Sequence, residues 1–226
     1  VITMKIESCT VCNFGGHKCQ DAIVTRSYGN NTKELFVVCD GMSGLHMGTE
    51  ASKTVVDTFA KVWDENWAKE SINTLIVKAV SEAKAKIDKL TRYDAGSTMV
   101  LAATDGDHLT IAHLGDSRAY FYRKGEGLLY QTTDHITIGA EGWPYVSKGI
   151  FNFRDLEKPT VKTFKVKDGD RLLLCTDGLY GCYRGNALQE LLSQNMSIGT
   201  MMSNIIGYCD EYSTDDTSGV LIEFQL

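Results

Sequence analysis

The chain has 226 residues, of which 43% are hydrophobic, and a formal net charge of −6. That length and composition fit one globular domain, which we expect to span residues 1–226. No long basic run and no apolar segment near the ~20 residues needed to cross a bilayer are present, which argues against nucleic-acid and membrane partners. The seven cysteines are odd in number and scattered, a usage typical of reduced thiols, so we expect a cytoplasmic protein.

The hydrophobic periods predict strands first, then a helix pair, then many strands, a second helix pair and a last strand. The expected strands are 4–12, 21–27, 34–39, 97–104, 108–114, 118–123, 127–132, 160–166, 170–175 and 219–226. The expected helices are 51–67, 72–90 with Ser71 as its N-cap, 186–194 and 197–212. Residues 135–158 follow no clean period, and we interpret them as an irregular flap.

This order does not alternate strand and helix, as a parallel sheet would require. It favours an α+β layered sandwich, in which two antiparallel β-sheets pack together and are flanked by pairs of helices. Cys9 and Cys12 form a lone CxxC without a second pair of ligands, and the segment is strand-like, so a metal or redox role is not favoured there.

Two apolar strands end in the same way, on an aspartate followed by glycine. Asp40 follows "ELFVVC" and Asp177 follows "DRLLLCT". A strand end is a rigid mount, and glycine allows the backbone to approach a ligand closely. A single Asp-Gly after a strand is most often a turn, but the repetition around two separate strands weakens that interpretation.

Further aspartates occupy comparable places. Asp21 begins a predicted strand, Asp116 lies in the tight turn "LGDSR", and Asp215 and Asp216 precede the last strand. Carboxylates without nearby His or Cys ligands favour Mg²⁺ or Mn²⁺ over Zn²⁺. Several carboxylates around two such ions indicate metal-assisted hydrolysis of a phosphate ester, in which a water bridging the ions attacks the phosphorus.

The ordered series of motifs resembles the metal-dependent serine/threonine protein phosphatases, the PPM or type-2C family, in a compact form like its bacterial members. The motifs that carry the resemblance are "CQDA", "FVVCDGMSGLHMGTEAS", "GSTMVLAAT", "LTIAHLGDSRAYFYR", "TTDH", "DRLLLCTDGLYG" and "STDDTSGVLIEF". Each motif is weak alone, but their order and spacing cover the chain from about residue 13.

The resemblance implies a sandwich of two antiparallel sheets with outer helix pairs, and hydrolysis of phosphoserine and phosphothreonine in proteins with two Mn²⁺ or Mg²⁺ ions. Carried over by position, Asp40 bridges both ions with the Gly41 carbonyl beside it. Asp177 and Asp215 hold one ion and Asp21 completes the other site. Asp116 corresponds to an aspartate of a third, weaker ion. The partners implied are a phosphoprotein substrate and a cognate Ser/Thr kinase, and we expect a monomer that takes part in signalling.

The sequence departs from the family pattern near the phosphate. Gln20 stands where many members have Glu, and Gly16 stands where a phosphate-binding Arg is expected. His17 or Lys18 would have to replace that arginine, or else belong to an ordinary solvated loop. Ser43 replaces a motif glycine.

A general acid is also not in the family's usual place. Met42 and Leu45 occupy positions where relatives carry His, while His46 follows one step later. His46 is the candidate for protonating the leaving oxygen, the alternative being a solvated residue at a helix entry. These departures keep two other hypotheses open, a non-catalytic relative that binds a phosphoprotein or partner, and a phosphatase for a small phosphorylated molecule.

Overall fold

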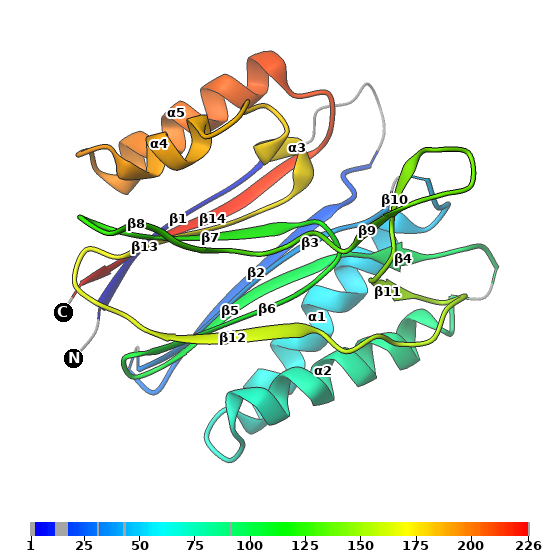
Figure 1. Cartoon of the computed structure of the whole chain (residues 1–226). Coiled ribbons are helices and arrows are strands. Elements are labelled where there is room, and N and C mark those ends of the chain that lie inside the picture. Colours follow the sequence, from blue (N-terminus) through cyan, green and yellow to red (C-terminus); the bar gives the residue numbers. More distant parts are fainter. Residues whose placement is uncertain (1–2, 12–17, 31, 43, 91, 226) are drawn as a thin grey trace.

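The computed structural model describes residues 3–11, 18–30, 32–42, 44–90 and 92–225. Two five-stranded antiparallel sheets form the centre (Figure 1). The first sheet has the order β1 (Thr3–Val11), β14 (Thr217–Gln225), β13 (Arg171–Cys175), β7 (Arg118–Arg123) and β8 (Gly127–Gln131). The second has the order β12 (Thr160–Lys165), β6 (His108–Leu114), β5 (Met99–Asp105), β3 (Lys33–Asp40) and β2 (Asp21–Tyr28).

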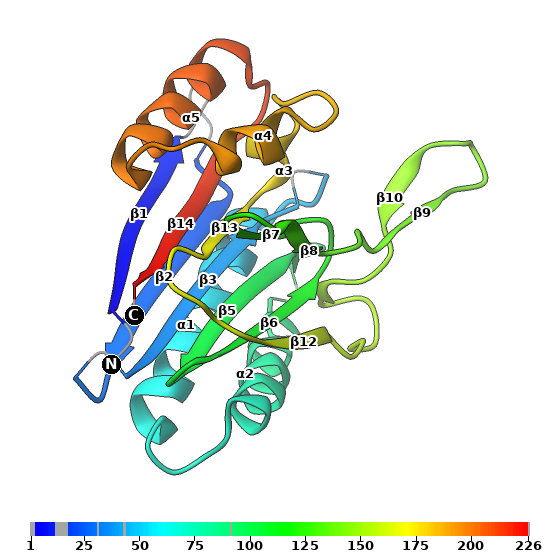
Figure 2. The ribbon, with the colours of Figure 1, turned by 60° about the vertical axis from the view of Figure 1, so that its left-hand side comes forward.

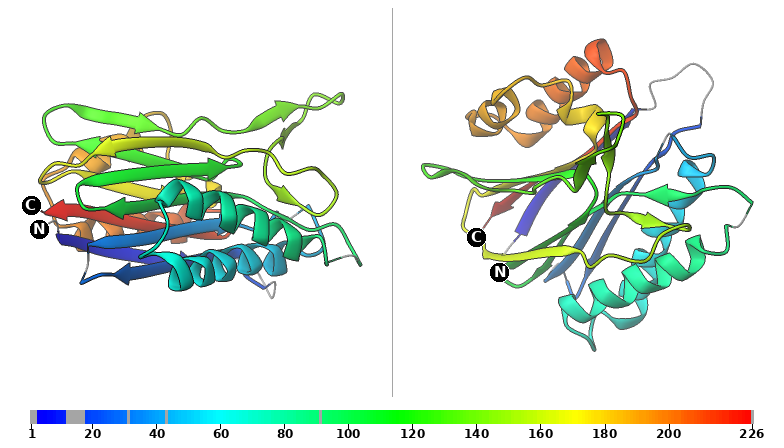
Figure 3. Two further views of the ribbon diagram at one scale, coloured as in Figure 1. Left: turned by 90° about the horizontal axis from the view of Figure 1, so that it is seen from below. Right: turned by 45° about the vertical axis from the view of Figure 1, so that its right-hand side comes forward.

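The sheets face each other and the helices cover the two outer surfaces, as the right-hand view of Figure 3 shows. Helices α1 (Gly48–Asn66) and α2 (Ile72–Ile87) pack on the second sheet. Helices α4 (Ala187–Ser193) and α5 (Ile198–Tyr212) pack on the first. The predicted layered sandwich of antiparallel sheets flanked by helix pairs is therefore confirmed. In the described ranges, no helix is long and apolar enough to cross a membrane.

The strand sequences follow from this layering. In β3, Leu35, Val37 and Cys39 face the helices, whereas Phe36 and Val38 join the core between the sheets. Both faces are buried, which explains why the strand is a continuous apolar run rather than an alternating one. Ser71 caps α2 by accepting a hydrogen bond from the Thr74 amide, as its position suggested.

The segment 135–158 is more regular than the sequence indicated. It contains β9 (Ile136–Ile138) and β10 (Pro144–Val146), which form a hairpin, and β11 (Ile150–Phe151), which pairs with β4 (Gly96–Ser97). The hairpin projects from the body of the molecule (Figure 2). Its side chains are mostly exposed, Trp143 by 74%. Strands of two or three residues without a buried face carry no usable period, which is why the sequence did not reveal them.

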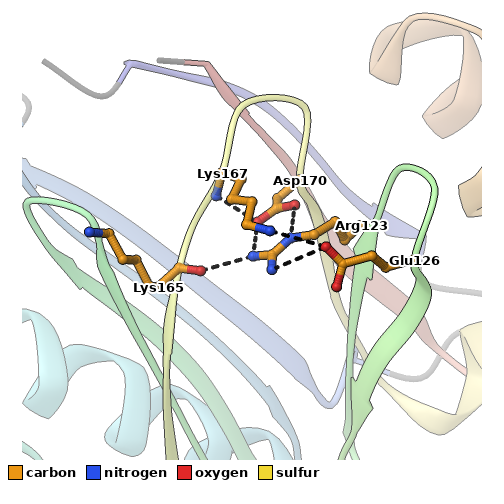
Figure 4. Close-up of polar contacts among 5 residues, drawn as sticks. All are labelled: Arg123, Glu126, Lys165, Lys167 and Asp170. Atoms are coloured by element: carbon orange, nitrogen blue, oxygen red, sulfur yellow. Dashed lines mark hydrogen bonds and ion pairs between the residues drawn. The ribbon is translucent and has the colours of Figure 1, made fainter.

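A buried ion pair fastens the ends of the sheets remote from the Asp-Gly motifs (Figure 4). Arg123 of β7 donates to both carboxylate oxygens of Asp170, at 2.8 and 2.7 Å, and to the Lys165 carbonyl at the end of β12. The Lys167 amide also donates to Asp170, whose side chain is completely buried. The exposed Lys167–Glu126 pair beside it contributes little, because surface ion pairs are largely offset by solvent.

The cysteines depart in one respect from the expectation of reduced thiols. Cys9, Cys39, Cys175, Cys182 and Cys209 are free, but Cys19 is disulfide-bonded. Cys9 lies buried under α5, and burial raises the pKa of its thiol to about 11, which disfavours the thiolate needed for metal or redox chemistry. Cys12 lies outside the described residues.

Candidate active site

The carboxylates come together at one edge of the two sheets. Because β2 and β3 are antiparallel, Asp21 at the start of one lies directly opposite Asp40 at the end of the other. Like charges in that position repel each other unless a proton or a cation intervenes. Asp40 is also close enough to Asp177 for the charge of that carboxylate to raise the pKa of Asp40, after burial and the charge of Asp21. The edge therefore concentrates negative charge from separate strands.

Asp177 is mounted on a helical turn rather than at a bare strand end. It is the first residue of the four-residue helix α3 (Asp177–Tyr180), which the sequence analysis did not predict. Thr176, just before it, donates its hydroxyl to Asp21 at 2.9 Å, which ties the two sheets together across the site. Asp177 Oδ1 is buried without a hydrogen-bond partner. A buried carboxylate oxygen without a partner is costly and is a position that a cation would satisfy.

The glycine of each Asp-Gly motif is required by a close backbone approach. A Cβ on Gly41 would collide with the carbonyl group of Gly48, and a Cβ on Gly178 would collide with the carbonyl oxygen of Asp216. In the first motif this approach seats the start of α1 against the end of β3. In the second it brings the segment carrying Asp215 and Asp216 against α3. The motif glycines thus assemble the site by letting its segments touch.

Four aspartates at this edge hold their protons more tightly than usual. Burial, followed by the charges of Asp21 and Asp177, raises the pKa of Asp40 well above its ordinary value. Burial raises the pKa of Asp21 to about 8 against hydrogen bonds from Ser218 and Thr176. Burial, followed by the charge of Asp177, raises the pKa of Asp116 to about 6 and also raises that of Asp215.

A cavity of about 420 Å³ opens over these carboxylates. Asp40, Asp116, Asp177 and Asp215 line its floor, and the root of the hairpin forms another wall. Among the described lining residues, Arg154 supplies the positive charge. Its guanidinium lies over the rings of Phe151, Phe153 and Tyr145, 5.0 to 5.5 Å from their centroids. The sequence analysis missed Arg154, because nothing in an aperiodic segment showed that its residues return to the site.

The other predicted residues lie elsewhere. His46 is exposed and stacks on Tyr93 with ring centroids 5.0 Å apart, and it is not among the residues that line the cavity. Lys18 is exposed and also absent from the lining. His17 lies outside the described residues, as do Gly16 and Ser43. Asp216, considered only as a neighbour of Asp215, accepts the Gln20 amide at 2.8 Å and contributes to the raised pKa of Asp21.

The donor set fits hard divalent cations. Its members are carboxylates, the Asp177 oxygen lacks a partner, and Gly41 follows Asp40 directly in the chain. In the described part of the chain, no three His, Cys, Asp or Glu side chains are arranged closely enough to hold an ion as they stand. Metal ligands must be deprotonated, so a bound ion would displace the protons that burial favours on Asp21 and Asp40.

Comparison with known proteins places the chain in a family. A family model described as protein phosphatase 2C matches residues 12–212, so the chain belongs to the protein phosphatase 2C family. A serine/threonine phosphatase, stp, of Listeria monocytogenes is 26% identical over 215 residues, covering 85% of this chain and 84% of that one. A putative protein phosphatase of Mycoplasma genitalium is 25% identical over 231 residues, covering 87% and 86%.

Solved structures show the same fold. The serine/threonine phosphatase of S. agalactiae superposes with a TM-score of 0.84 at 23% identity, covering 98% of this chain and 99% of that one. The catalytic domain of the phosphatase PstP, solved in complex with two manganese ions, superposes with a TM-score of 0.80 at 21% identity over the whole of both chains. The architecture read from the strand order is thus that of the phosphatase family.

Proposed function

We propose that this chain hydrolyses phosphoserine and phosphothreonine in proteins with two Mn²⁺ or Mg²⁺ ions held at the carboxylate edge. The observation that carries the proposal is that Asp40, Asp116, Asp177 and Asp215 line one cavity, with Asp21 directly opposite Asp40 and with an Asp177 oxygen that has no partner. Bound there, the ions would supply an acidified water and positive charge for the phosphate oxygens.

The neighbours of each ligand support its proposed role. Asp40 is close to both Asp21 and Asp177 and would serve both ions, together with the Gly41 carbonyl. Asp177 and Asp215 line the same two pockets and would hold one ion. Asp21 would complete the other site. Asp116, which lines the same cavity, would serve a third, weaker ion.

Arg154 takes the phosphate-binding role that the sequence analysis gave to His17 or Lys18. It lines the cavity from the hairpin side, and its stacking on three aromatic rings limits the freedom of the guanidinium. A guanidinium presents paired donors that match two phosphate oxygens. His46 remains a predicted general acid only, because its ring stacks on Tyr93 outside the cavity lining.

The proposed reaction also implies which proteins this chain acts with. A phosphoprotein requires a Ser/Thr kinase to have phosphorylated it, so we propose that the chain acts opposite such a kinase in signalling. All the proposed ligands come from one chain, which supports action as a monomer.

The test is turnover of a phosphothreonine peptide and of p-nitrophenyl phosphate with Mn²⁺, with Mg²⁺ and with chelator. We expect metal-dependent turnover in the wild type and a loss of about 100-fold or more in Asp177→Asn, as befits loss of an electrostatic catalytic group. Asp57→Asn, on the exposed face of α1, is the matched control and should match the wild type. Turnover of small esters alone would make the chain a small-molecule phosphatase, and no turnover by a folded wild type would make it a binding relative.

A further inference from the structure

His135 contacts several segments near the site but has no role in the proposed chemistry. Its main chain and its ring bond the same residue, Gly115. The His135 amide donates to the Gly115 carbonyl at 3.0 Å, and the Gly115 amide donates back to His135 Nδ1 at 3.2 Å. Gly115 is the residue immediately before Asp116, so this reciprocal pair of bonds grips the turn that presents the Asp116 carboxylate to the cavity.

The conformation of this turn is also restricted by its own backbone and by Thr98. Gly115 has φ of +105°, a backbone conformation that only glycine adopts readily, and a Cβ there would lie 2.7 Å from Thr98. Thr98 accepts the Asp40 amide at 2.9 Å and bonds the Ser117 hydroxyl at 2.6 Å. The turn is thus fixed from the Asp40 side by Thr98 and from the opposite side by His135.

The same histidine fastens the root of the projecting hairpin. The Ser147 amide, just after β10, donates to the His135 carbonyl at 2.8 Å, so the two residues close the hairpin at its base. His135 Nε2 lies 3.1 Å from the Thr160 hydroxyl at the start of β12. The ring stacks on His113 with centroids 4.3 Å apart and planes only 3° from parallel. His135 therefore connects three segments that are far apart in the sequence.

The tautomer of the ring is set by these contacts. A backbone N–H can only donate, so His135 Nδ1 must accept, and the ring proton must sit on Nε2. Nε2–H then donates to the Thr160 hydroxyl. A residue that replaces His135 has to offer an acceptor at the position of Nδ1 if the Gly115 amide is to keep its partner.

The preceding residue strengthens the junction from the other side of the site. Asp134 accepts two hydrogen bonds from Arg118, at 2.8 and 2.7 Å, and the Arg118 guanidinium lies 3.7 Å from the centroid of the Tyr180 ring. Tyr180 is the last residue of α3, the turn that begins with Asp177. Asp134 thus holds the Asp116 segment at Arg118, two residues after Asp116, whereas His135 holds it at Gly115, the residue before Asp116.

We propose that His135 is a positioning residue that sets the place of Asp116, and with it the affinity of the weakest cation site, through the bond between its Nδ1 and the Gly115 amide. The inference rests on the proposed function, because it takes Asp116 to belong to a cation site. It concerns a residue that need not touch the substrate or an ion.

Three substitutions separate the two ring nitrogens. His135→Asn keeps an acceptor near the place of Nδ1, His135→Gln keeps a polar group near the place of Nε2, and His135→Leu keeps neither. His108→Leu is the control, because His108 begins the same strand that carries His113 but is exposed at its other end. Each full-length variant is first shown to melt cooperatively.

Two readouts are independent of turnover: hydrogen exchange of the Gly115 amide by NMR, and calorimetric titration with Mn²⁺. We expect exchange in H135L and H135Q to be roughly fivefold faster or more, as loss of one net hydrogen bond allows, with the weakest Mn²⁺ binding step weakened by a similar factor. H135N and the control H108L should stay within about twofold of the wild type. In turnover, H135L should lower kcat and leave KM for the phosphopeptide unchanged.

The inference is overturned if Gly115 exchange in H135L equals that of the wild type, or if H135Q preserves both readouts while H135N loses them. A wild type that binds no Mn²⁺ and turns nothing over would sink the proposed function instead. The exchange measurement would still decide whether His135 holds the Gly115 turn.

Discussion

Replacing Asp21 by Asn should stabilise the metal-free protein while weakening its metal site. Asp21 ordinarily has a pKa of 3.8, and burial raises its pKa to about 8 in the folded chain. The folded chain therefore binds more protons than the unfolded chain between those values. This contribution to stability is full at low pH and is lost as the pH rises from about 4 through 8.

The magnitude at pH 7 follows from that window. About 3 pH units separate 3.8 from 7, and each unit is worth about 1.4 kcal/mol, so keeping Asp21 protonated costs about 4 kcal/mol of folding free energy. Asn avoids this cost but bonds Thr176 less well, a loss of about 1 kcal/mol. The expected net gain is about 3 kcal/mol, or roughly 6–12 °C in Tm for a chain of this size.

The assay is thermal and urea unfolding in chelator at pH 4 and pH 7, for the wild type, Asp21→Asn and the exposed control Asp57→Asn. The gain in Asp21→Asn should appear at pH 7 and nearly vanish at pH 4, while the control stays within about 0.5 kcal/mol. Added Mn²⁺ should raise the Tm of the wild type more than that of Asp21→Asn. A gain of the same size at both pH values, or no gain, would refute the electrostatic reasoning.

Three other substitutions test separate parts of the account. Asp170→Asn removes the buried carboxylate that accepts from the partly exposed Arg123 guanidinium and should cost about 1.5–3 kcal/mol in urea unfolding, without changing the Mn²⁺ stoichiometry of the folded fraction. An unchanged unfolding midpoint would contradict the role of the ion pair. Gly178→Ala drives a methyl group into the Asp216 carbonyl and should reduce Mn²⁺ affinity in calorimetry by about tenfold or more, as mutations of residues that orient metal ligands do. Wild-type affinity in this variant would show that the close approach is not required. Arg154→Ala should raise KM for a phosphopeptide by about tenfold with a smaller change in Mn²⁺ affinity, and equal KM values would remove Arg154 from phosphate binding.

Much of the architecture could be predicted because the elements that define it are long. The apolar periods of α1, α2 and α5, and the continuous apolar run of β3, reflect faces that are buried in the fold. Helix α3 was missed because four residues cannot show a helical period. The hairpin of β9 and β10 was missed because its strands are three residues long and their side chains are mostly exposed.

The site, like the fold, has features that the local sequence indicates and others that only tertiary folding sets. The residue types and strand-end positions of Asp40 and Asp177 pointed to hard cations before any geometry was known. That Asp21 lies directly opposite Asp40 depends on strand register, which the sequence did not state. Arg154 reaches the cavity through tertiary folding of an aperiodic segment. His135 bonds Gly115 across 20 residues, and no local pattern encodes such a contact.

The most direct measurement of the central claim is a crystal structure of the full chain grown with Mn²⁺, with anomalous diffraction recorded at the manganese edge. The account predicts two strong peaks on either side of the Asp40 carboxylate, one near Asp177 and Asp215 and the other near Asp21. Absence of peaks at this edge of the sheets, or manganese bound only elsewhere on the molecule, would contradict the two-metal site on which the proposed activity depends.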